Sequence, residues 1–198
     1  MFFNKPPASN RVYLRNTLKH EKQFASLSCE ANSMSHFYNF YVTQANGGVP
    51  KVRSNLPPKY SEITEQAAFE LLPKNSKVPE YRQQDGKTLR IWGDPEREFV
   101  GDVTGRQSIA TNKLTGYGIH AAGILPPLQN ELKKIGYSAS IDEFSELRVT
   151  WNILQGDPLY FWYVLSDAPK DGFAKLEWQT ESGDKRIGYI GEHTGIIV

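Results

Sequence analysis

Residues 23–33 read QFASLSCEANS, and this stretch gives the strongest indication of fold in the 198-residue chain. Gln23 stands six residues before Cys29, which is the only cysteine. Ser28 is a preferred N-cap residue, and the apolar residues that follow recur at helical spacing. The sequence therefore predicts a helix from Cys29 to about Tyr41. A cysteine in a first helical turn lies at the positive end of the helix dipole, which favours the thiolate.

A second candidate residue, His193, lies near the other end of the sequence, in GEHTGIIV at residues 191–198. An imidazole can stabilise a thiolate as an ion pair and later protonate a leaving amine. The backbone N–H of Cys29 and the side-chain amide of Gln23 can donate to an oxyanion. The three residues together predict nucleophilic thiol chemistry. The alternative is an inert thiol, because free cysteines are among the most buried residues.

The stretch 23–33 resembles the nucleophile segment of papain-like cysteine peptidases. The closer resemblance is to the bacterial peptidase-like family related to bacteriocin-leader-processing (double-glycine-leader) peptidases. Further segments resemble that family in the same order: DPEREFVGD at 94–102, GYGIH at 116–120, LPPL at 125–128, QGDPL at 155–159 and GEHT at 191–194. The resemblance runs from about residue 22 to residue 198.

The resemblance implies a papain-like α+β fold with Cys29 as nucleophile, His193 as general base and acid, and Gln23 as oxyanion donor. It implies hydrolysis of a peptide or amide bond through an acyl-thioenzyme intermediate, by a bacterial protein at the cell surface or outside the cell. The family's third catalytic residue is an Asp or Asn on the strand after the His strand. The sequence ends five residues after His193, before that strand, so we expect weakened activity.

The pattern of elements also favours an α+β layout, in one domain over 1–198 with a helical part at about 21–136 and a sheet part at about 137–198. Further helices are expected at 62–72, capped by Ser61, from Pro126-Pro127 to Gly136, and at about 143–154. Strands are expected at 12–14, 137–141, 159–165, 175–180, 185–190 and 194–198, whereas 46–60 and 73–118 read as irregular.

The charge balance excludes a basic surface for nucleic acid, since 23 Lys and Arg face 22 Asp and Glu for a net charge of +1. No stretch approaches the length of a membrane span, and Met1–Pro7 has too short an apolar part for a signal peptide. The four histidines are scattered without metal-ligand spacing. We expect a monomer that acts on a peptide or protein substrate without a cofactor or metal.

Several other residues have two interpretations. Glu30 could tune the thiol, but a carboxylate that complements the helix dipole is the simpler reading. His36 reads as a packing or surface residue, whereas His120 could line a cleft with walls formed by 116–118 and 94–105. The carboxylates of 94–102 read as a solvated loop, and Trp151 and Trp162 as core residues.

Three other functions stay open. The same cleft could hold a peptide or cell-wall fragment without cleaving it, and the missing orienting residue favours that binding module. The chain could be a structural or surface domain in which Cys29 only fills the core. Transferases and glutamine amidases of the wider superfamily use the same three residue types.

Overall fold

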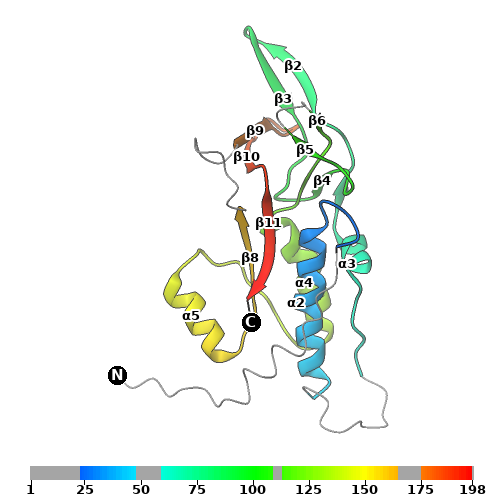
Figure 1. Ribbon diagram of the computed structural model, residues 1–198, viewed down its shortest axis with the longest axis vertical. Coiled ribbons are helices and arrows are strands. Elements are labelled where there is room, and N and C mark those ends of the chain that lie inside the picture. The colour runs from blue at the N-terminus through cyan, green and yellow to red at the C-terminus, as the bar shows by residue number, and fades with distance from the viewer. Residues whose placement is uncertain (1–22, 48–58, 109–112, 165–174, 198) are drawn as a thin grey trace.

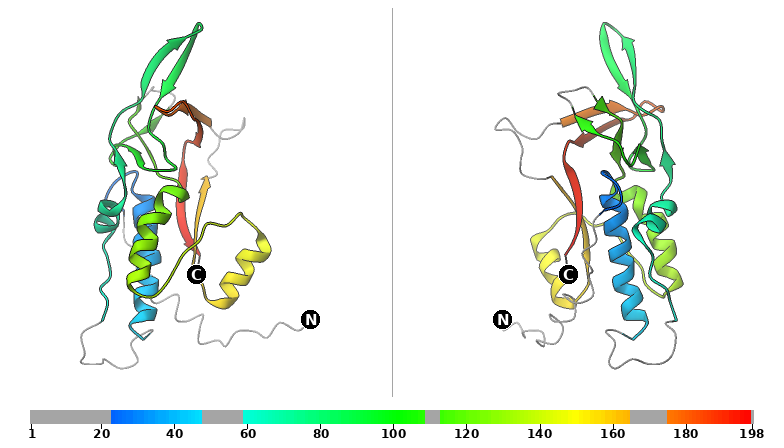
Figure 2. Two further views of the ribbon diagram at one scale, coloured as in Figure 1. Left: turned by 180° about the vertical axis from the view of Figure 1, so that it is seen from behind. Right: turned by 45° about the vertical axis from the view of Figure 1, so that its right-hand side comes forward.

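The structure is a computed structural model that describes residues 23–47, 59–108, 113–164 and 175–197. Within these ranges the chain is a mixed α+β protein with four helices and several small sheets, as the sequence predicts. The strand expected at 12–14 lies outside the described residues, as does most of the loop expected at 46–60. Figures 1 and 2 show two long helices side by side, a two-stranded ribbon beside them and a group of hairpins at one end.

The helices are α2 (Cys29–Ala45), α3 (Glu65–Leu71), α4 (Ala121–Lys134) and α5 (Glu146–Gln155). Helix α2 begins at the predicted residue and continues past Tyr41 to Ala45. The predicted start of α3 was wrong, because the Thr64 side chain, not Ser61, caps it by accepting a hydrogen bond from Ala67 N at 3.1 Å.

The predicted start of α4 was also wrong, because Pro126 and Pro127 lie inside the helix. Helix α4 begins five residues earlier, directly after His120. The two prolines lie beyond the first turn, so each removes one backbone hydrogen-bond donor from the helix. The helix ends as predicted at Gly136, whose φ of 86° is the left-handed conformation common after helices.

Eleven strands are described: β1 (Lys74–Asn75), β2 (Glu80–Gln84), β3 (Lys87–Ile91), β4 (Phe99–Gly101), β5 (Gln107–Ser108), β6 (Lys113–Leu114), β7 (Gly116–Gly118), β8 (Leu159–Val164), β9 (Lys175–Gln179), β10 (Lys185–Tyr189) and β11 (Glu192–Ile197). They form sheets in the orders β1-β4-β7, β10-β9-β3-β2, β11-β8 and β5-β6. The hairpin predicted around Ser182–Asp184 is confirmed as β9 and β10. The strand expected at 137–141 is absent from the described residues, and 73–118 holds β1 to β7 instead of irregular chain.

The main core fills the space between α2, α4 and the ribbon formed by β8 and β11. Met34 and Leu132 are fully buried where the two helices face one another. Alternate residues of the ribbon, Tyr160, Trp162 and Ile196, pack against the same core. Trp162 is therefore next to the core, as expected, and one face of the ribbon looks toward α2.

A second apolar cluster holds the hairpins together at the other end of the molecule. Its members are Trp92, Val100, Leu114, Tyr117, Leu176 and Trp178. Strand β7 belongs to this end, yet its next residue, Ile119, belongs to the main core. The segment 116–120 therefore passes between the two clusters, close to the first turn of α2.

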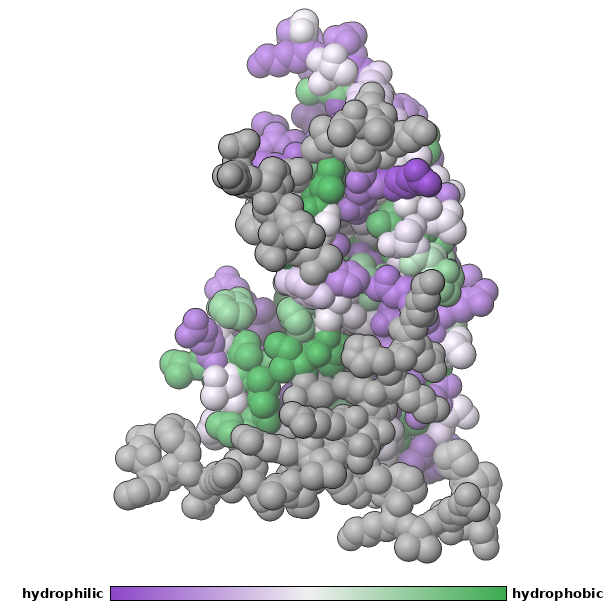
Figure 3. Space-filling view, viewed as in Figure 1, coloured by the Kyte–Doolittle hydropathy of each residue, from purple (hydrophilic) through white to green (hydrophobic). Residues whose placement is uncertain are grey.

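Helix α5 buries none of its residues. Phe144, Leu147 and Trp151 are exposed by 84%, 85% and 59%, so the prediction that Trp151 is a core residue was wrong. Figure 3 shows hydrophobic side chains gathered over this part of the surface. In the described ranges, no helix has both the length and the apolar character that a membrane span requires.

Candidate functional site

The first turn of α2 is held in place by a carboxylate from α3. The Ser28 hydroxyl donates to Glu65 Oε1 at 2.5 Å, and Asn32 Nδ2 donates to Glu65 Oε2 at 3.1 Å. Ser28 occupies the N-cap position but makes no capping bond to α2; its hydroxyl oxygen instead accepts a hydrogen bond from Ala25 N at 3.2 Å. Glu65 therefore places a negative charge at the positive end of the α2 dipole and fixes the helix start.

The Cys29 thiol is buried, with 7% of the residue exposed. It donates a hydrogen bond to Glu30 Oε2, with Sγ and Oε2 3.2 Å apart. Burial, followed by the charge of Glu30 and this hydrogen bond, raises the pKa of the Cys29 thiol far above its usual range, although hydrogen bonds from Thr194 act in the opposite direction. In this conformation Cys29 is a neutral thiol.

Glu30 lies in the first turn of α2 and is buried with Cys29, where it contacts the thiol. Its Oε1 accepts a hydrogen bond from Ile119 N at 3.2 Å, and its main-chain oxygen accepts one from the Tyr160 hydroxyl at 2.6 Å. Burial raises the pKa of the Glu30 carboxyl to about 7. The sequence signal for this arrangement is a carboxylate directly after the candidate nucleophile.

His193 lies on β11, the strand that packs against α2, but its ring does not face the thiol. Its neighbour Thr194 is buried and donates to Ser33 Oγ at 3.0 Å, which puts Thr194 on the α2 side of the ribbon. Successive strand residues point to opposite faces. The His193 ring accordingly lies against the Tyr163 ring, at 5.5 Å between centroids, and burial lowers its pKa.

Gln23, the predicted oxyanion donor, is partly buried in the segment that leads into α2. Among the described residues, its side-chain amide has no hydrogen-bond partner. The structure therefore brings together the start of α2 and the strand that carries His193, but it does not place the amide, the thiol and the imidazole in mutual contact.

His120 belongs to a separate polar network that the sequence did not reveal. Its Nδ1 lies 2.7 Å from Glu96 Oε1 and its Nε2 lies 2.9 Å from the Tyr117 hydroxyl. That hydroxyl also donates to Glu192 Oε2. The network links the end of β7 to the first residue of β11.

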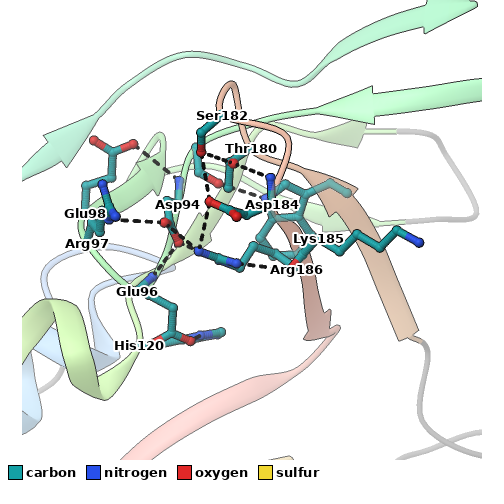
Figure 4. A network of polar contacts seen from close by, with 12 residues as sticks. Asp94, Glu96, Arg97, Glu98, His120, Thr180, Ser182, Asp184, Lys185 and Arg186 are labelled. Carbon is teal, nitrogen blue, oxygen red and sulfur yellow. Dashed lines mark hydrogen bonds and ion pairs between the residues drawn. The ribbon is translucent and has the colours of Figure 1, made fainter. Parts of the chain in front are cut away.

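The carboxylates of 94–102 do not form a uniformly solvated loop, so that expectation was wrong for Asp94. Arg186 Nε and Nη2 donate to the two oxygens of Asp94 at 2.7 and 2.8 Å, and only 8% of Asp94 is exposed (Figure 4). Arg186 holds the pKa of Asp94 below its usual value through these hydrogen bonds. This pair fastens the loop after β3 to β10, and Figure 4 shows the neighbouring Glu96 reaching toward His120.

No group of three or more acidic, His or Cys side chains in the described residues could hold a metal ion. The expected cleft wall 116–118 is fully buried. A hollow of about 490 Å³ is present instead on α5, where Leu147, Arg148, Trp151 and Leu154 contribute to its lining. None of the predicted site residues lines that hollow.

The chain matches no protein-family model, no curated protein and no solved structure.

Proposed function

We propose that this chain is a cysteine peptidase-like hydrolase with a papain-like fold, and that Cys29 attacks a peptide or amide bond. One observation supports this most directly: the first turn of a 17-residue helix, with Cys29 at its start, packs against the strand that carries His193. In the first turn, unpaired backbone N–H groups favour negative charge on sulfur and can donate to an oxyanion.

In the proposed reaction, the S–H proton of Cys29 passes to His193 as Sγ bonds to the substrate carbonyl carbon and the carbonyl oxygen takes up the electron pair. The backbone N–H of Cys29 and the amide of Gln23 stabilise that oxyanion. His193 protonates the leaving amine as the carbon–nitrogen bond breaks, which leaves a thioester. Water then attacks the thioester with His193 as base, and the acid product leaves.

This chemistry needs a change in the ribbon of β8 and β11, because His193 now faces away from α2. A shift of one residue in strand register transfers every side chain to the opposite face. In the described residues β11 pairs with β8 alone, so six residue pairs hold its register. A substrate that displaces Thr194 and exposes the thiol would bring the imidazole to the sulfur.

The proposal is tested with a peptidyl electrophile that modifies thiols, together with hydrolysis of a quenched fluorescent peptide library. We expect the wild type to be labelled at Cys29 and to cleave library members, and Cys29→Ala to lose both. His193→Ala should lose cleavage, whereas His36→Ala, a histidine on the same helix as Cys29, should retain it. Cleavage that survives in Cys29→Ala would refute the proposal.

The geometry of the thiol favours a second candidate, a module that holds a peptide or cell-wall fragment without cleaving it. The thiol is neutral and buried, and the imidazole lies on the other face of the ribbon. This arrangement is expected if the site binds a ligand without cleaving it. In that case peptide retention should be equal for the wild type and Cys29→Ser, with no cleavage by either form.

The resemblance to a bacterial extracytoplasmic family supports a place of action at the cell surface or outside the cell.

A further inference from the structure

Cys29 and Glu30 are adjacent residues whose reactive groups are both buried and in contact. The thiol sulfur lies 3.2 Å from Glu30 Oε2, and 7% and 6% of the two residues are exposed. A carboxyl group is costly to bury without partners, so its surroundings show what holds it there. Among the described residues no cation pairs with it; its partners are the thiol, the N–H of Ile119 and its own backbone N–H.

The position of the Glu30 carboxyl is fixed by β7 and by the residue after it. A Cβ atom at Gly118 would lie 2.1 Å from Glu30 Oε1, so the carboxyl occupies the space that any other side chain would need. Ile119 N then donates to the same oxygen. The carboxyl cannot move away from the thiol toward β7, so the second oxygen stays at the sulfur.

Other ionisable groups around the pair come from three strands, and none of those in the described part of the chain is a cation. Tyr160 of β8 donates to the main-chain oxygen of Glu30, and burial, followed by the charges of both groups, raises its pKa. Tyr117 of β7 feels the charge of Glu30 in the same way. Glu192 of β11 adds a second negative charge, which disfavours ionisation of Glu30.

We propose that Glu30 sets the ionisation of Cys29: a charged carboxyl makes the thiol hold its proton to higher pH, and a protonated carboxyl favours the thiolate. Two groups in contact titrate as a pair, and a second negative charge is costly in a buried site. The first proton therefore leaves the carboxyl and the second leaves the sulfur. The thiolate also arises without a change in net charge, when the S–H proton moves to Oε2.

For the proposed hydrolase, and resting on that function, Glu30 is a catalytic residue because it touches the reacting sulfur. Above neutral pH the charged carboxylate of Glu30 disfavours ionisation of the Cys29 thiol. Glu30 also offers a protonated carboxyl that stabilises the thiolate by donating to it.

The test follows the S–H stretching band of Cys29 in the infrared, alongside the ultraviolet absorbance of the thiolate, across the pH range. The single cysteine makes the S–H band specific, and the thiolate absorbance is taken as the difference from Cys29→Ser because tyrosinates absorb in the same region. Neither signal requires access to the buried thiol or a substrate. In the wild type we expect the S–H band to shift with a midpoint near pH 7, when its acceptor becomes charged. In Glu30→Gln we expect no such shift.

Glu30→Gln should also lose the thiol proton at a pH at least about one unit lower than the wild type, since an adjacent charge moves a pKa by about 1–3 units. Glu65→Gln is the matched control, because Glu65 binds the first turn of α2 through Ser28 and Asn32 without contacting the thiol. It should titrate like the wild type.

A wild-type S–H band that does not change with pH would overturn the proposal, as would a shift that survives in Glu30→Gln. Thiolate formation at an equal or higher pH in that variant would overturn it as well. If Glu30→Gln fails to fold, the pH titration of the wild-type S–H band still tests the proposal by itself. If the S–H band of the wild type shifts near pH 7 but the wild type cleaves no peptide, the proposed hydrolase function is refuted and the coupling of Glu30 and Cys29 stands.

Discussion

Gly118 is the residue on which the geometry around the thiol depends most. Its φ of 126° is a conformation that L side chains rarely adopt, and the Glu30 carboxyl stands where a Cβ would lie. We expect Gly118→Ala to lower the free energy of unfolding by at least about 2 kcal/mol, because backbone strain and overpacking each cost about 1–3 kcal/mol. Urea denaturation measures this change.

The control is Gly183→Ala in the β9–β10 turn, where φ is 92° and nothing lies within 4 Å of the added Cβ. That variant carries the backbone strain without the steric overlap. Equal losses in the two variants would mean that the Glu30 carboxyl can yield to a methyl group.

Glu30 also makes stability depend on pH. The pKa of its carboxyl is about 7 in the folded protein against an ordinary 4.5, so the folded state binds this proton more tightly than the unfolded state. The free energy of unfolding should therefore fall as pH rises from 4.5 to 7, by about 3 kcal/mol at about 1.4 kcal/mol per pKa unit.

Urea midpoints at pH 5 and pH 8 for the wild type and Glu30→Gln measure this contribution as a difference between the two proteins. The wild type should lose more stability between the two pH values than the variant does. Parallel losses would assign the pH dependence to other groups.

Among the elements, β10 is fastened to the loop after β3 by the Asp94–Arg186 pair, whose side chains are 10% and 22% exposed. We expect Asp94→Ala to cost about 1–3 kcal/mol, because it leaves a partly buried guanidinium without its main partner. The exposed pair of Lys77 and Glu181 provides the contrast, and Glu181→Ala should cost under about 1 kcal/mol. Thermal unfolding measures the loss of stability in each variant. Equal losses would mean that the partly buried pair contributes no more stability than the surface pair.

The elements also show where sequence reasoning succeeded. The start of α2 was predictable from Ser28 and the apolar spacing after Cys29, and the β9–β10 hairpin from its Ser-Gly-Asp turn. The hairpin of β2 and β3 was missed although Asp85-Gly86 is a strong turn signal. Every residue of β2 is exposed, so the alternation of apolar and polar residues that marks a half-buried strand was missing.

At the site, sequence order could nominate Cys29, His193 and Gln23, but it could not give the face of a strand on which a residue lies. That face depends on register, and a change of one residue exchanges His193 for Thr194 beside α2. The buried position of Glu30 was equally invisible, because it depends on Gly118 and Ile119, far away in sequence.

Across the whole molecule, apolar side chains are distributed unevenly between the core and α5. Leu132 is fully buried, whereas Leu147 is 85% exposed. We expect Leu132→Ala to cost about 2–5 kcal/mol through lost burial and a cavity, and Leu147→Lys to leave stability within about 0.5 kcal/mol. Leu147→Lys should also reduce self-association, measured by light scattering; a marked loss of stability would mean that α5 packs through Leu147.

The contact between β11 and the first turn of α2 has a consequence for biosynthesis. The hydrogen bond from Thr194 to Ser33 joins residues 161 positions apart, so the ribbon can cover the thiol only after nearly all described residues have been made. Closing so long a loop is slow compared with forming local helices. On the ribosome Cys29 would stay open to oxidants and other thiols, and its protection would mark the completion of folding.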